Sequence, residues 1–312
     1  MTMTEEMSGT EMSGNEQAKC GLVAVIGAPN AGKSTLVNQL VGQKVAITSP
    51  KAQTTRARLL GIALQDDVQI VLADTPGIFT PKRRLDRAMV SAAWDGAEAA
   101  DAVLLVVDSV KRRRHELEPL LETLENRPER KILVLNKVDA SAKEPLLKLA
   151  QDLNDRIAFD TVFFVSARDG DGVADLKAHL AGLMPEGPWL YPEDQVSDAS
   201  QRLLAAEITR EQLYLQLRDE LPYDSAVRPE AYVERKDGSV EIRQQIVIGR
   251  DTQKAIVLGH RGARIKAIGE AARKELSELL GQKVHLFLHV KVEENWAENR
   301  EFYEELGLDW VK

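Results

Sequence analysis

Five apolar runs alternate with amphipathic segments through the first half of the chain, and this alternation restricts the fold more than any other feature. Most runs are apolar at nearly every position, as is typical of parallel strands that are buried on both faces. The segments between them have the length and spacing of helices. The pattern therefore predicts an α/β fold with right-handed crossovers. The expected strands are 22–27, 68–74, 102–108, 131–136 and 161–166, and helices are expected at 144–157 and 173–183.

A proline-rich stretch divides the chain into two parts. Pro185, Pro188 and Pro192 lie within nine residues together with Gly187, and no helix or central strand could continue through them. At 312 residues the chain has the length of two ordinary domains. We therefore expect a disordered extension over 1–19, a first domain over 20–184, a linker over 185–198 and a second domain over 199–312.

The second half has a different order of elements, namely α-β-β-α-α-β. The strands are joined through the Asp237-Gly238 turn, which is a strong hairpin signal. A final acidic segment predicts a C-terminal helix over 294–306. The expected elements before it are a helix over 199–220, strands over 231–235 and 239–248, a helix over 252–258, a turn over 259–262, a longer helix with one apolar stripe, and a strand over 284–292.

Composition excludes several classes of protein. The apolar runs are far shorter than the roughly 20 residues of a membrane helix. Cys20 is the only cysteine, so neither an intrachain disulfide nor a cysteine-rich metal site can form. The acidic N-terminus lacks the basic and apolar regions of a secretory signal. We expect a cytoplasmic protein. A basic cluster at 111–115 is more simply a solvated loop than a phosphate contact, and the tryptophans at 94, 189, 296 and 310 are expected to pack internally.

A glycine-rich loop follows the first expected strand and precedes a helix. Its sequence, Gly27-Ala28-Pro29-Asn30-Ala31-Gly32-Lys33-Ser34, fits the loop that wraps nucleotide phosphates with backbone N–H groups. The lysine would neutralise the β- and γ-phosphates and the serine hydroxyl would bind Mg²⁺. The candidates for phosphate binding are Gly27, Asn30, Ala31, Gly32, Lys33, Ser34 and Thr35.

Two further motifs lie at the ends of later strands, where α/β sheets bind ligands. In Asp74-Thr75-Pro76-Gly77 the carboxylate can reach the metal and the glycine N–H can sense the γ-phosphate. In Asn136-Lys137-Val138-Asp139 the carboxylate of Asp139 can accept from the N1–H and amino groups of guanine. An alternative role for Asp139 is a helix N-cap.

The last expected strand ends in Ser166-Ala167-Arg168, which supplies a backbone N–H for the guanine carbonyl. This set of motifs in this order resembles the GTPase family. Together with Lys51-Ala52-Gln53-Thr54-Thr55-Arg56 and a Gly-x-x-Gly turn in the second half, it resembles the Era family of bacterial GTPases. The resemblance implies a P-loop GTPase domain with a mixed, mostly parallel sheet, followed by an α+β type II KH domain. It also implies that Thr55 joins Mg²⁺ in the GTP state, with Thr54 as the competing candidate.

One departure from Ras-like GTPases concerns hydrolysis. Ile78 stands where those proteins have the glutamine that orients the attacking water. Slow basal turnover of GTP to GDP is therefore expected, and it would rise when a partner or a cation completes the site. K⁺ held with the help of Asn30 is one candidate cofactor. A structural hydrogen bond within the loop is the other interpretation of Asn30.

Gly259-His260-Arg261-Gly262 resembles the loop by which KH domains bind single-stranded RNA. The whole chain has a net charge of −8, but residues 225–291 contain thirteen Lys and Arg against eight Asp and Glu, a net charge of +5. Ile256, Ile265 and Ile268 are expected to line a groove for bases. The candidates for RNA binding are Gly259, His260, Arg261, Gly262, Arg264 and Lys266.

The family resemblance implies binding to 16S ribosomal RNA near its 3′ end and a role in assembly of the small (30S) subunit. It also suggests peripheral contact with the inner membrane. We expect a monomer that does not bind DNA. In a second hypothesis the C-terminal domain is a protein- or membrane-interaction module. A third hypothesis, GTP as a structural element without turnover, is weakened by the presence of both Mg²⁺ ligands.

Overall fold

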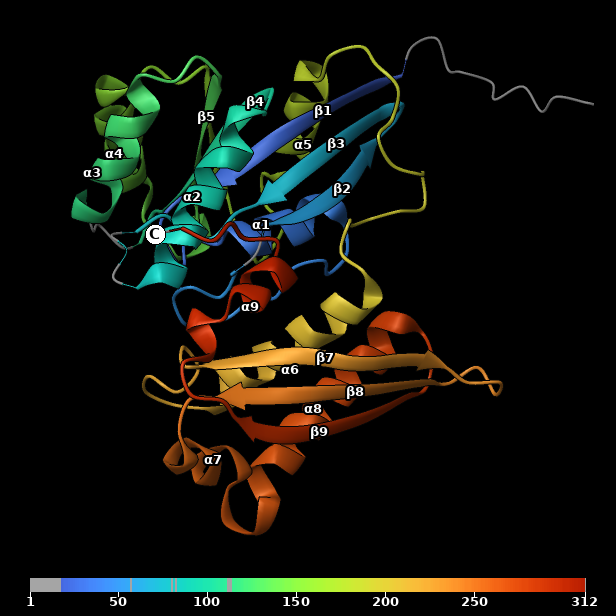
Figure 1. Ribbon diagram of the computed structural model, residues 1–312. Helices are drawn as coiled ribbons and strands as arrows, with labels where there is room; N and C mark the ends of the chain where they lie inside the picture. Colours follow the sequence, from blue (N-terminus) through green and yellow to red (C-terminus); the bar gives the residue numbers. More distant parts are fainter. Residues whose placement is uncertain (1–17, 57, 80, 82, 111–113, 312) are drawn as a thin grey trace, which may run out of the picture.

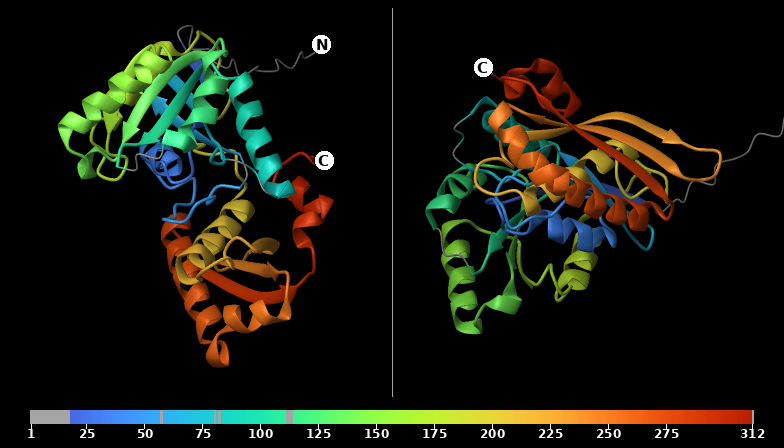
Figure 2. Two further views of the ribbon diagram at one scale, coloured as in Figure 1. Left: turned by 90° about the vertical axis from the view of Figure 1, so that its left-hand side faces the viewer. Right: turned by 90° about the horizontal axis from the view of Figure 1, so that it is seen from below.

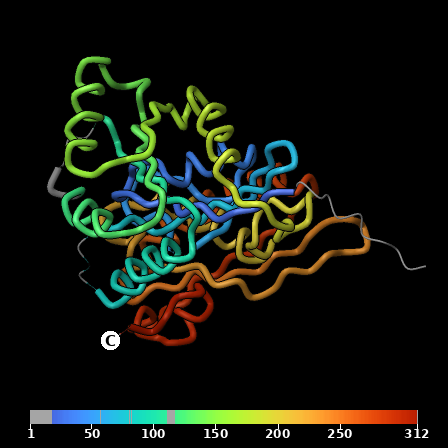
Figure 3. The backbone as a smooth tube through the Cα atoms, turned by 90° about the horizontal axis from the view of Figure 1, so that it is seen from above, coloured from blue at the N-terminus to red at the C-terminus, as the bar shows by residue number. Residues whose placement is uncertain are grey.

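The computed structural model of the protein describes residues 18–311 except 57, 80, 82 and 111–113. Most of the expected N-terminal extension and the centre of the basic cluster at 111–115 therefore lie outside the described residues. The chain forms two domains, the first above the second in Figure 1. The left view of Figure 2 shows the C-terminal segment at the boundary between them, and Figure 3, seen from above, shows this segment at one side of the molecule.

A six-stranded sheet forms the centre of the first domain, with strand order β2-β3-β1-β4-β5-β6. All neighbours pair in parallel except β2, which is antiparallel to β3. The mixed, mostly parallel sheet predicted from the sequence is confirmed. The antiparallel edge strand β2 was not among the expected strands. The strands are β1 (Lys19–Ile26), β2 (Leu59–Gln65), β3 (Val68–Asp74), β4 (Ala102–Asp108), β5 (Arg130–Asn136) and β6 (Thr161–Val165).

Helices cover both faces of this sheet, because its strands are apolar on both sides. On one face α1 and α5 bury side chains such as Leu36 and Leu176. On the other face α2, α3 and α4 contribute Ala93, Leu120 and Leu153. The helices are α1 (Lys33–Val41), α2 (Arg84–Glu98), α3 (Arg114–Glu125), α4 (Lys143–Arg156) and α5 (Val173–Leu183), with a 3₁₀ turn at Val138–Ala140.

The second domain is a three-stranded sheet in the order β7-β8-β9, with β7 antiparallel and β9 parallel to β8. One face carries the helices, as Figure 1 shows. The order α-β-β-α-α-β expected from the sequence is confirmed. The elements are α6 (Gln201–Gln216), β7 (Ser225–Glu234), β8 (Val240–Ile248), α7 (Asp251–Leu258), the 3₁₀ turn His260–Gly262, α8 (Ala263–Leu280) and β9 (Val284–Val292).

Two sequence expectations in this half were wrong. The first strand begins at Ser225 and not at 231, because Pro229 lies on an edge strand at a register shift, where a missing N–H is tolerated. The acidic C-terminal segment is not one helix. It forms a 3₁₀ turn (Trp296–Glu298) and a short α9 (Arg300–Glu305), because Asn295 has a positive φ and Asn299 caps α9.

The C-terminal segment packs between the domains. Trp296, Phe302 and Tyr303 cover Ala226 and Val247 on the sheet of the second domain. The same cluster includes residues of α2 in the first domain, such as Leu85 and Met89. This segment therefore connects the first domain to the face of the small sheet that the helices leave uncovered.

The segment between α5 and α6 follows the edge of the first domain. Gln69 of β3 accepts hydrogen bonds from the N–H groups of Leu190 and Tyr191 at 2.9 and 3.0 Å. The indole of Trp189 donates to the carbonyl of Asp67 at 3.1 Å. The linker is thus attached along its length, although it contains no helix. Trp94, Trp189, Trp296 and Trp310 all pack against apolar clusters, as expected.

Within the described ranges, none of the helices combines the length and the apolar character that crossing a membrane requires.

The packing of the C-terminal segment generates a stability prediction. Phe302 is buried and its ring meets Trp296 edge to face, with centroids 4.9 Å apart. We predict that Phe302→Ala lowers the free energy of unfolding by about 3–5 kcal/mol, because it leaves a cavity. Urea unfolding followed by tryptophan fluorescence measures the change. The control is Phe287→Ala on the exposed face of β9, for which less than about 1 kcal/mol is expected. Equal losses for the two variants would contradict the packing described.

Candidate functional site

The sequence motifs meet at one edge of the large sheet, because parallel strands end on the same side. The loops after β1, β3, β5 and β6 all lie there. Gly32 has φ +97°, and a Cβ at this position would come within 2.2 Å of the side-chain nitrogen of Asn136. That nitrogen donates to the carbonyl of Ala31 at 2.9 Å. The glycine-rich loop and the loop after β5 are therefore in direct contact.

Lys33 is buried at the start of α1. Its ammonium donates to the carbonyls of Gly27 and Ala28, at 3.2 Å in each case. Burial lowers the pKa of Lys33 to about 8, against a smaller opposite effect of Asp74. The positive charge of Lys33 is thus only partly balanced by its two carbonyl partners, and it lies beside the loop of backbone N–H groups. This arrangement suits an anion with several oxygens, such as a phosphate chain.

Three oxygen-bearing side chains converge beside Lys33. The Ser34 hydroxyl donates to Asp74 Oδ2 at 2.7 Å and lies 2.9 Å from the Thr55 hydroxyl. Thr55 also donates to Asp74 Oδ2 at 3.3 Å. Thr54 is directed elsewhere, because its hydroxyl donates to the carbonyl of Lys51. Of the two threonines that the sequence left open, only Thr55 lies with Ser34 and Asp74.

Asp74 is fully buried, and burial raises the pKa of its carboxyl, against the opposing effects of Lys33, Ser34 and Thr55. Its Oδ1 has no hydrogen-bond partner in the described structure. A buried carboxylate oxygen without a partner is costly. The site therefore favours a cation at this position.

The predicted base-binding residues also come together. Asn136 Oδ1 accepts from the N–H groups of Lys137 and Ala167, at 2.8 and 3.0 Å. Asp139 accepts from the Ser166 hydroxyl at 2.8 Å and pairs with Arg168 at 2.9 Å. Because Arg168 is largely exposed, its contact with Asp139 can be exchanged for another donor.

Lys137 connects three of these loops. Its ammonium donates to the carbonyl of Asn30 and to Asp108 Oδ2, both at 2.7 Å. Sequence reasoning did not include Asp108. It ends β4 at the same edge of the sheet, and this position was the signal that could have identified it.

The remaining loop residues are fixed by the backbone. Ile78 is buried, and its N–H donates to the carbonyl of Gly27 at 3.1 Å. Gly77 lies against Pro29, where a Cβ would come within 2.9 Å of the proline backbone. Asn30 donates from its amide to the carbonyl of Pro50 at 3.0 Å. The structural interpretation of Asn30 thus has a visible partner.

The Gly-x-x-Gly turn lies between α7 and α8 and is solvent-accessible. Gly259 has φ +69°, and a Cβ there would come within 2.7 Å of Arg264 Cβ, so the turn requires glycine. His260, Arg261, Arg264 and Lys266 are all exposed. Of the expected groove residues, Ile256 is exposed and Ile265 half-buried, but Ile268 is fully buried in the core. The expectation for Ile268 was wrong because an apolar stripe does not show which of its members faces outward.

The segment 47–56, which we call the switch segment, touches the second domain along α6. The N–H of Thr48 donates to Glu211 at 2.7 Å, and Arg210 donates to the carbonyl of Thr54 at 2.6 Å. The Tyr214 hydroxyl donates to the carbonyl of Gln53 at 3.2 Å. Just before this segment, Lys44 pairs with Glu211 of α6 and Glu275 of α8.

Arg56 is a further buried residue of this contact. Its guanidinium donates to the carbonyls of Ser225, Tyr223 and Pro222, at 2.6, 2.9 and 3.2 Å. Burial lowers the pKa of Arg56, yet a guanidinium remains charged at any physiological pH. Sequence reasoning gave Arg56 no role, although it directly follows Thr55.

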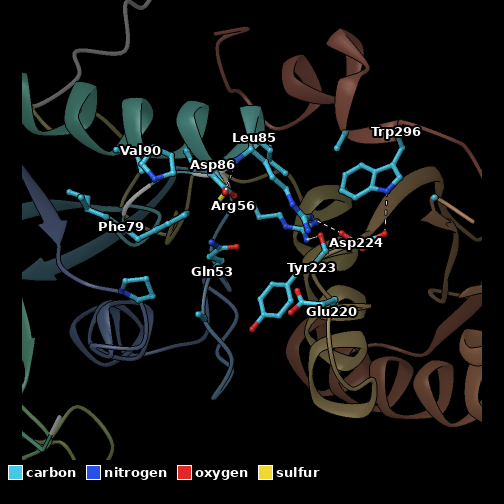
Figure 4. Close-up of a pocket in the computed structure, with 18 of the residues that line it drawn as sticks. Gln53, Arg56, Phe79, Leu85, Asp86, Val90, Glu220, Tyr223, Asp224 and Trp296 are labelled. Atoms are coloured by element: carbon cyan, nitrogen blue, oxygen red, sulfur yellow. Dashed lines mark hydrogen bonds and ion pairs between the residues drawn. The ribbon is translucent and has the colours of Figure 1, made fainter. Parts of the chain in front are cut away.

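A cavity of about 1420 Å³ lies between the domains beside these residues. Figure 4 shows Gln53 and Arg56 on the side of the first domain, opposite Tyr223 and Asp224 of the second. Asn30 and Gln53 line both this cavity and the small pocket around Lys33. The phosphate loop and the domain boundary are thus next to each other.

The lowered pKa of Lys33 generates a prediction about pH. A bound phosphate stabilises the ammonium form, so above pH about 8 binding of a guanine nucleotide should take up as much as one proton. Affinity should then fall with rising pH, by up to about tenfold per pH unit. Calorimetry at about pH 9 in buffers of different ionisation enthalpy measures the uptake. Lys177→Met is the control, because Lys177 is a partly buried lysine with a lowered pKa on α5. Binding without proton uptake would contradict the assignment.

Comparisons with known proteins agree with this geometry. Residues 22–137 match the family model described as "50S ribosome-binding GTPase", and residues 220–297 match the KH domain. The chain is 74% identical to GTPase Era of Erythrobacter litoralis, over 95% of this chain and 98% of that protein. It is 56% identical to GTPase Era of Brucella suis, over 97% and 99% of the two chains.

Solved structures agree as well. The structure of Aquifex aeolicus Era Y63A bound to GDP·AlF4⁻ has 36% identity, a TM-score of 0.87 and coverage of 93% of this chain and 99% of that chain. The structure of Era in complex with MgGDPNP and nucleotides 1506–1542 of 16S ribosomal RNA has the same identity and coverage, with a TM-score of 0.84. Both relatives and both solved structures are Era proteins, and each matches this chain over nearly its full length. The chain therefore belongs to the Era family of GTPases.

Proposed function

We propose that this GTPase binds single-stranded ribosomal RNA through its KH domain and that the switch segment connects the two activities. The observation that carries the proposal is the position of that segment. Thr55 lies with the hydroxyl and carboxylate groups beside Lys33, while its neighbour Arg56 is buried in the second domain. Because Thr55 and Arg56 are adjacent in the sequence, a change at the phosphates would also be felt at the contact with the RNA-binding domain.

Mg²⁺ fits the group formed by Ser34, Thr55 and Asp74. The buried Oδ1 of Asp74 lacks a partner, and hydroxyl and carboxylate oxygens are ligands that Mg²⁺ prefers. The described residues contain no cluster of three His, Cys, Asp or Glu, which agrees with a cation held largely by phosphates and water. When bound, Mg²⁺ supplies charge that offsets the negative charge of the phosphates. Thr55 is preferred over Thr54, which is bonded to Lys51.

The proposal extends to the other parts of the nucleotide. The phosphates lie along the N–H groups of Gly27, Asn30, Ala31, Gly32, Lys33, Ser34 and Thr35, and Gly77 meets the γ-phosphate. Guanine takes the place of Arg168 at Asp139, while Asn136 holds the loops of Lys137 and Ala167 around it. Since Ile78 is buried and apolar, backbone groups must position the attacking water, and slow basal turnover follows. K⁺ dependence stays a prediction.

The RNA lies on the turn at Gly259–Gly262, with Arg261, Arg264 and Lys266 near its phosphates. The solved relative carries a 16S segment, which supports small-subunit RNA as the target and 30S assembly as the process. The family model whose description names the 50S ribosome matches only residues 22–137, which lie outside the RNA-binding domain. A cytoplasmic monomer is consistent with this role. KH domains bind RNA, and this disfavours the second domain as a protein- or membrane-interaction module.

RNA binding is tested by a matched pair of glycine substitutions. Gly259→Asp adds a Cβ and a negative charge where the RNA backbone must approach. We expect affinity for single-stranded 16S RNA to fall at least about tenfold. The control Gly281→Asp adds the same charge at a similar φ of +64° at the far end of α8, where nothing lies within 4 Å. Fluorescence anisotropy over a salt series measures both, and wild-type affinity should fall steeply with salt. Equal affinities for the two variants would refute the site.

Coupling between the domains is tested at Arg56. Arg56→Met removes the hydrogen bonds to Ser225, Tyr223 and Pro222, while the exposed Arg58→Met serves as the control. Ordinary coupling would make RNA affinity about 5- to 150-fold different between the complex with a GTP analogue and the complex with GDP. We expect this ratio to fall toward one in Arg56→Met. GTP affinity should lose its dependence on RNA by the same factor. Tyr214→Phe removes only a hydroxyl and gives a milder test if Arg56→Met folds poorly. Unchanged coupling in both variants excludes this route.

A further inference from the structure

The small sheet of the second domain has a face that its helices do not cover. Along β8 and β9 alternate side chains point inward, and Ile242, Ile246 and Leu288 pack on the helices. The residues between them lie on the opposite face, away from the helices, which are behind the sheet in Figure 1. The C-terminal segment covers only the end near Val247. We call the uncovered remainder the outer face, and its side chains on β8 and β9 are Glu241, Arg243, Gln245, His285, Phe287, His289 and Lys291.

An aromatic ring lies near the middle of the outer face. Phe287 is 51% exposed, and it is directly opposite Arg243 in the strand register. The Arg243 guanidinium lies 5.6 Å from the ring centroid. Sheets that bind RNA use an exposed aromatic ring as a stacking surface for a base, and an adjacent arginine adds a planar cation.

The charges on this face favour an anionic strand. Glu241 is 16% exposed, while its partner Arg243 is 60% exposed. Glu293 is 23% exposed, while its partner Lys291 is 50% exposed. The imidazole of His289 is likewise more exposed than its partner Glu230. In each pair the acid is less exposed to solvent than its basic partner.

Only strand β9 separates the outer face from the helices on either side of the Gly-x-x-Gly turn. Both α7 and α8 pack on β9, and Leu288 lies beside Gly269 of α8. Because side chains alternate along a strand, the preceding residue, Phe287, belongs to the opposite face, and β9 is the edge of the sheet. An RNA strand that leaves the Gly-x-x-Gly turn and passes around the edge of β9 would therefore reach Phe287.

We propose that the outer face is a second contact for the same single-stranded RNA, in which a base stacks on Phe287 and phosphates meet Arg243 and Lys291. This inference rests on the proposed RNA binding at Gly259–Gly262. It assigns these residues to a longer RNA than the roughly four nucleotides that a KH turn holds.

The test compares two fluorescent, unpaired RNAs from the 16S segment, of about six and about fifteen nucleotides, on the full chain. Phe287→Leu should weaken binding of the longer RNA by about tenfold and leave the shorter RNA unchanged, because only the longer one reaches the ring. Phe287→Tyr keeps the ring and should bind as the wild type does. Leu147→Ala, an exposed apolar residue on α4, is the control for loss of apolar surface.

A crosslinking readout locates the contact directly. 5-Iodouridine placed along the longer RNA should crosslink to the peptide that contains Phe287. If Phe287→Leu leaves the longer RNA unaffected and no crosslink forms, the outer face does not contact RNA. In that outcome Gly259→Asp still abolishes binding of both RNAs if the proposed function holds. If the wild type binds neither RNA, the proposed function itself fails.

Discussion

Burial of two opposite charges, Lys33 and Asp74, is the constraint on which the nucleotide site depends. Burial lowers the pKa of Lys33 to about 8 and raises the pKa of Asp74, so in each residue the ionised form is disfavoured. The protein alone offers Lys33 two carbonyls and leaves one oxygen of Asp74 without a partner. In the proposed function, anionic phosphates and a divalent cation would supply the missing partners. The site is thus organised before the ligand arrives, and its electrostatic cost is offset by binding.

The switch segment extends this dependence to the second domain. Thr55 is held by Ser34 and Asp74, and Arg56 is held by three carbonyls of the turn between α6 and β7. Each hydrogen bond from a charged group contributes about 1.5–3 kcal/mol, so a displacement at one end of this segment is opposed at the other. A ligand that fixes Thr55 also restricts where α6 can dock. Helix α8, which begins at the Gly-x-x-Gly turn, joins this network through Glu275 and Lys44.

The sequence predicted what local patterns determine. Strands β3 and β4 were located to the residue because continuous apolar runs end sharply in polar motifs, and β9 because apolar and polar residues alternate along it. The convergence of Ser34, Asp74, Asn136 and Ser166 followed from parallel strands that end at one edge. Contacts between residues far apart in the chain carry no such pattern. Arg56 and Ser225 are separated by 169 positions, and nothing in the composition of either segment indicates that they meet.

The uneven distribution of charge along the chain determines where an anionic strand can bind. Residues 225–291 have a net charge of +5, whereas the chain as a whole has −8. A polyanion is therefore attracted to the part of the second domain formed by residues 225–291 and repelled by the acidic remainder of the chain, with an effect that reaches about one Debye length, roughly 8 Å at physiological salt. The anionic nucleotide instead enters a small site whose field comes from Lys33 and backbone N–H groups. One acidic protein can in this way hold two anions, because each meets a local field opposite to the net charge.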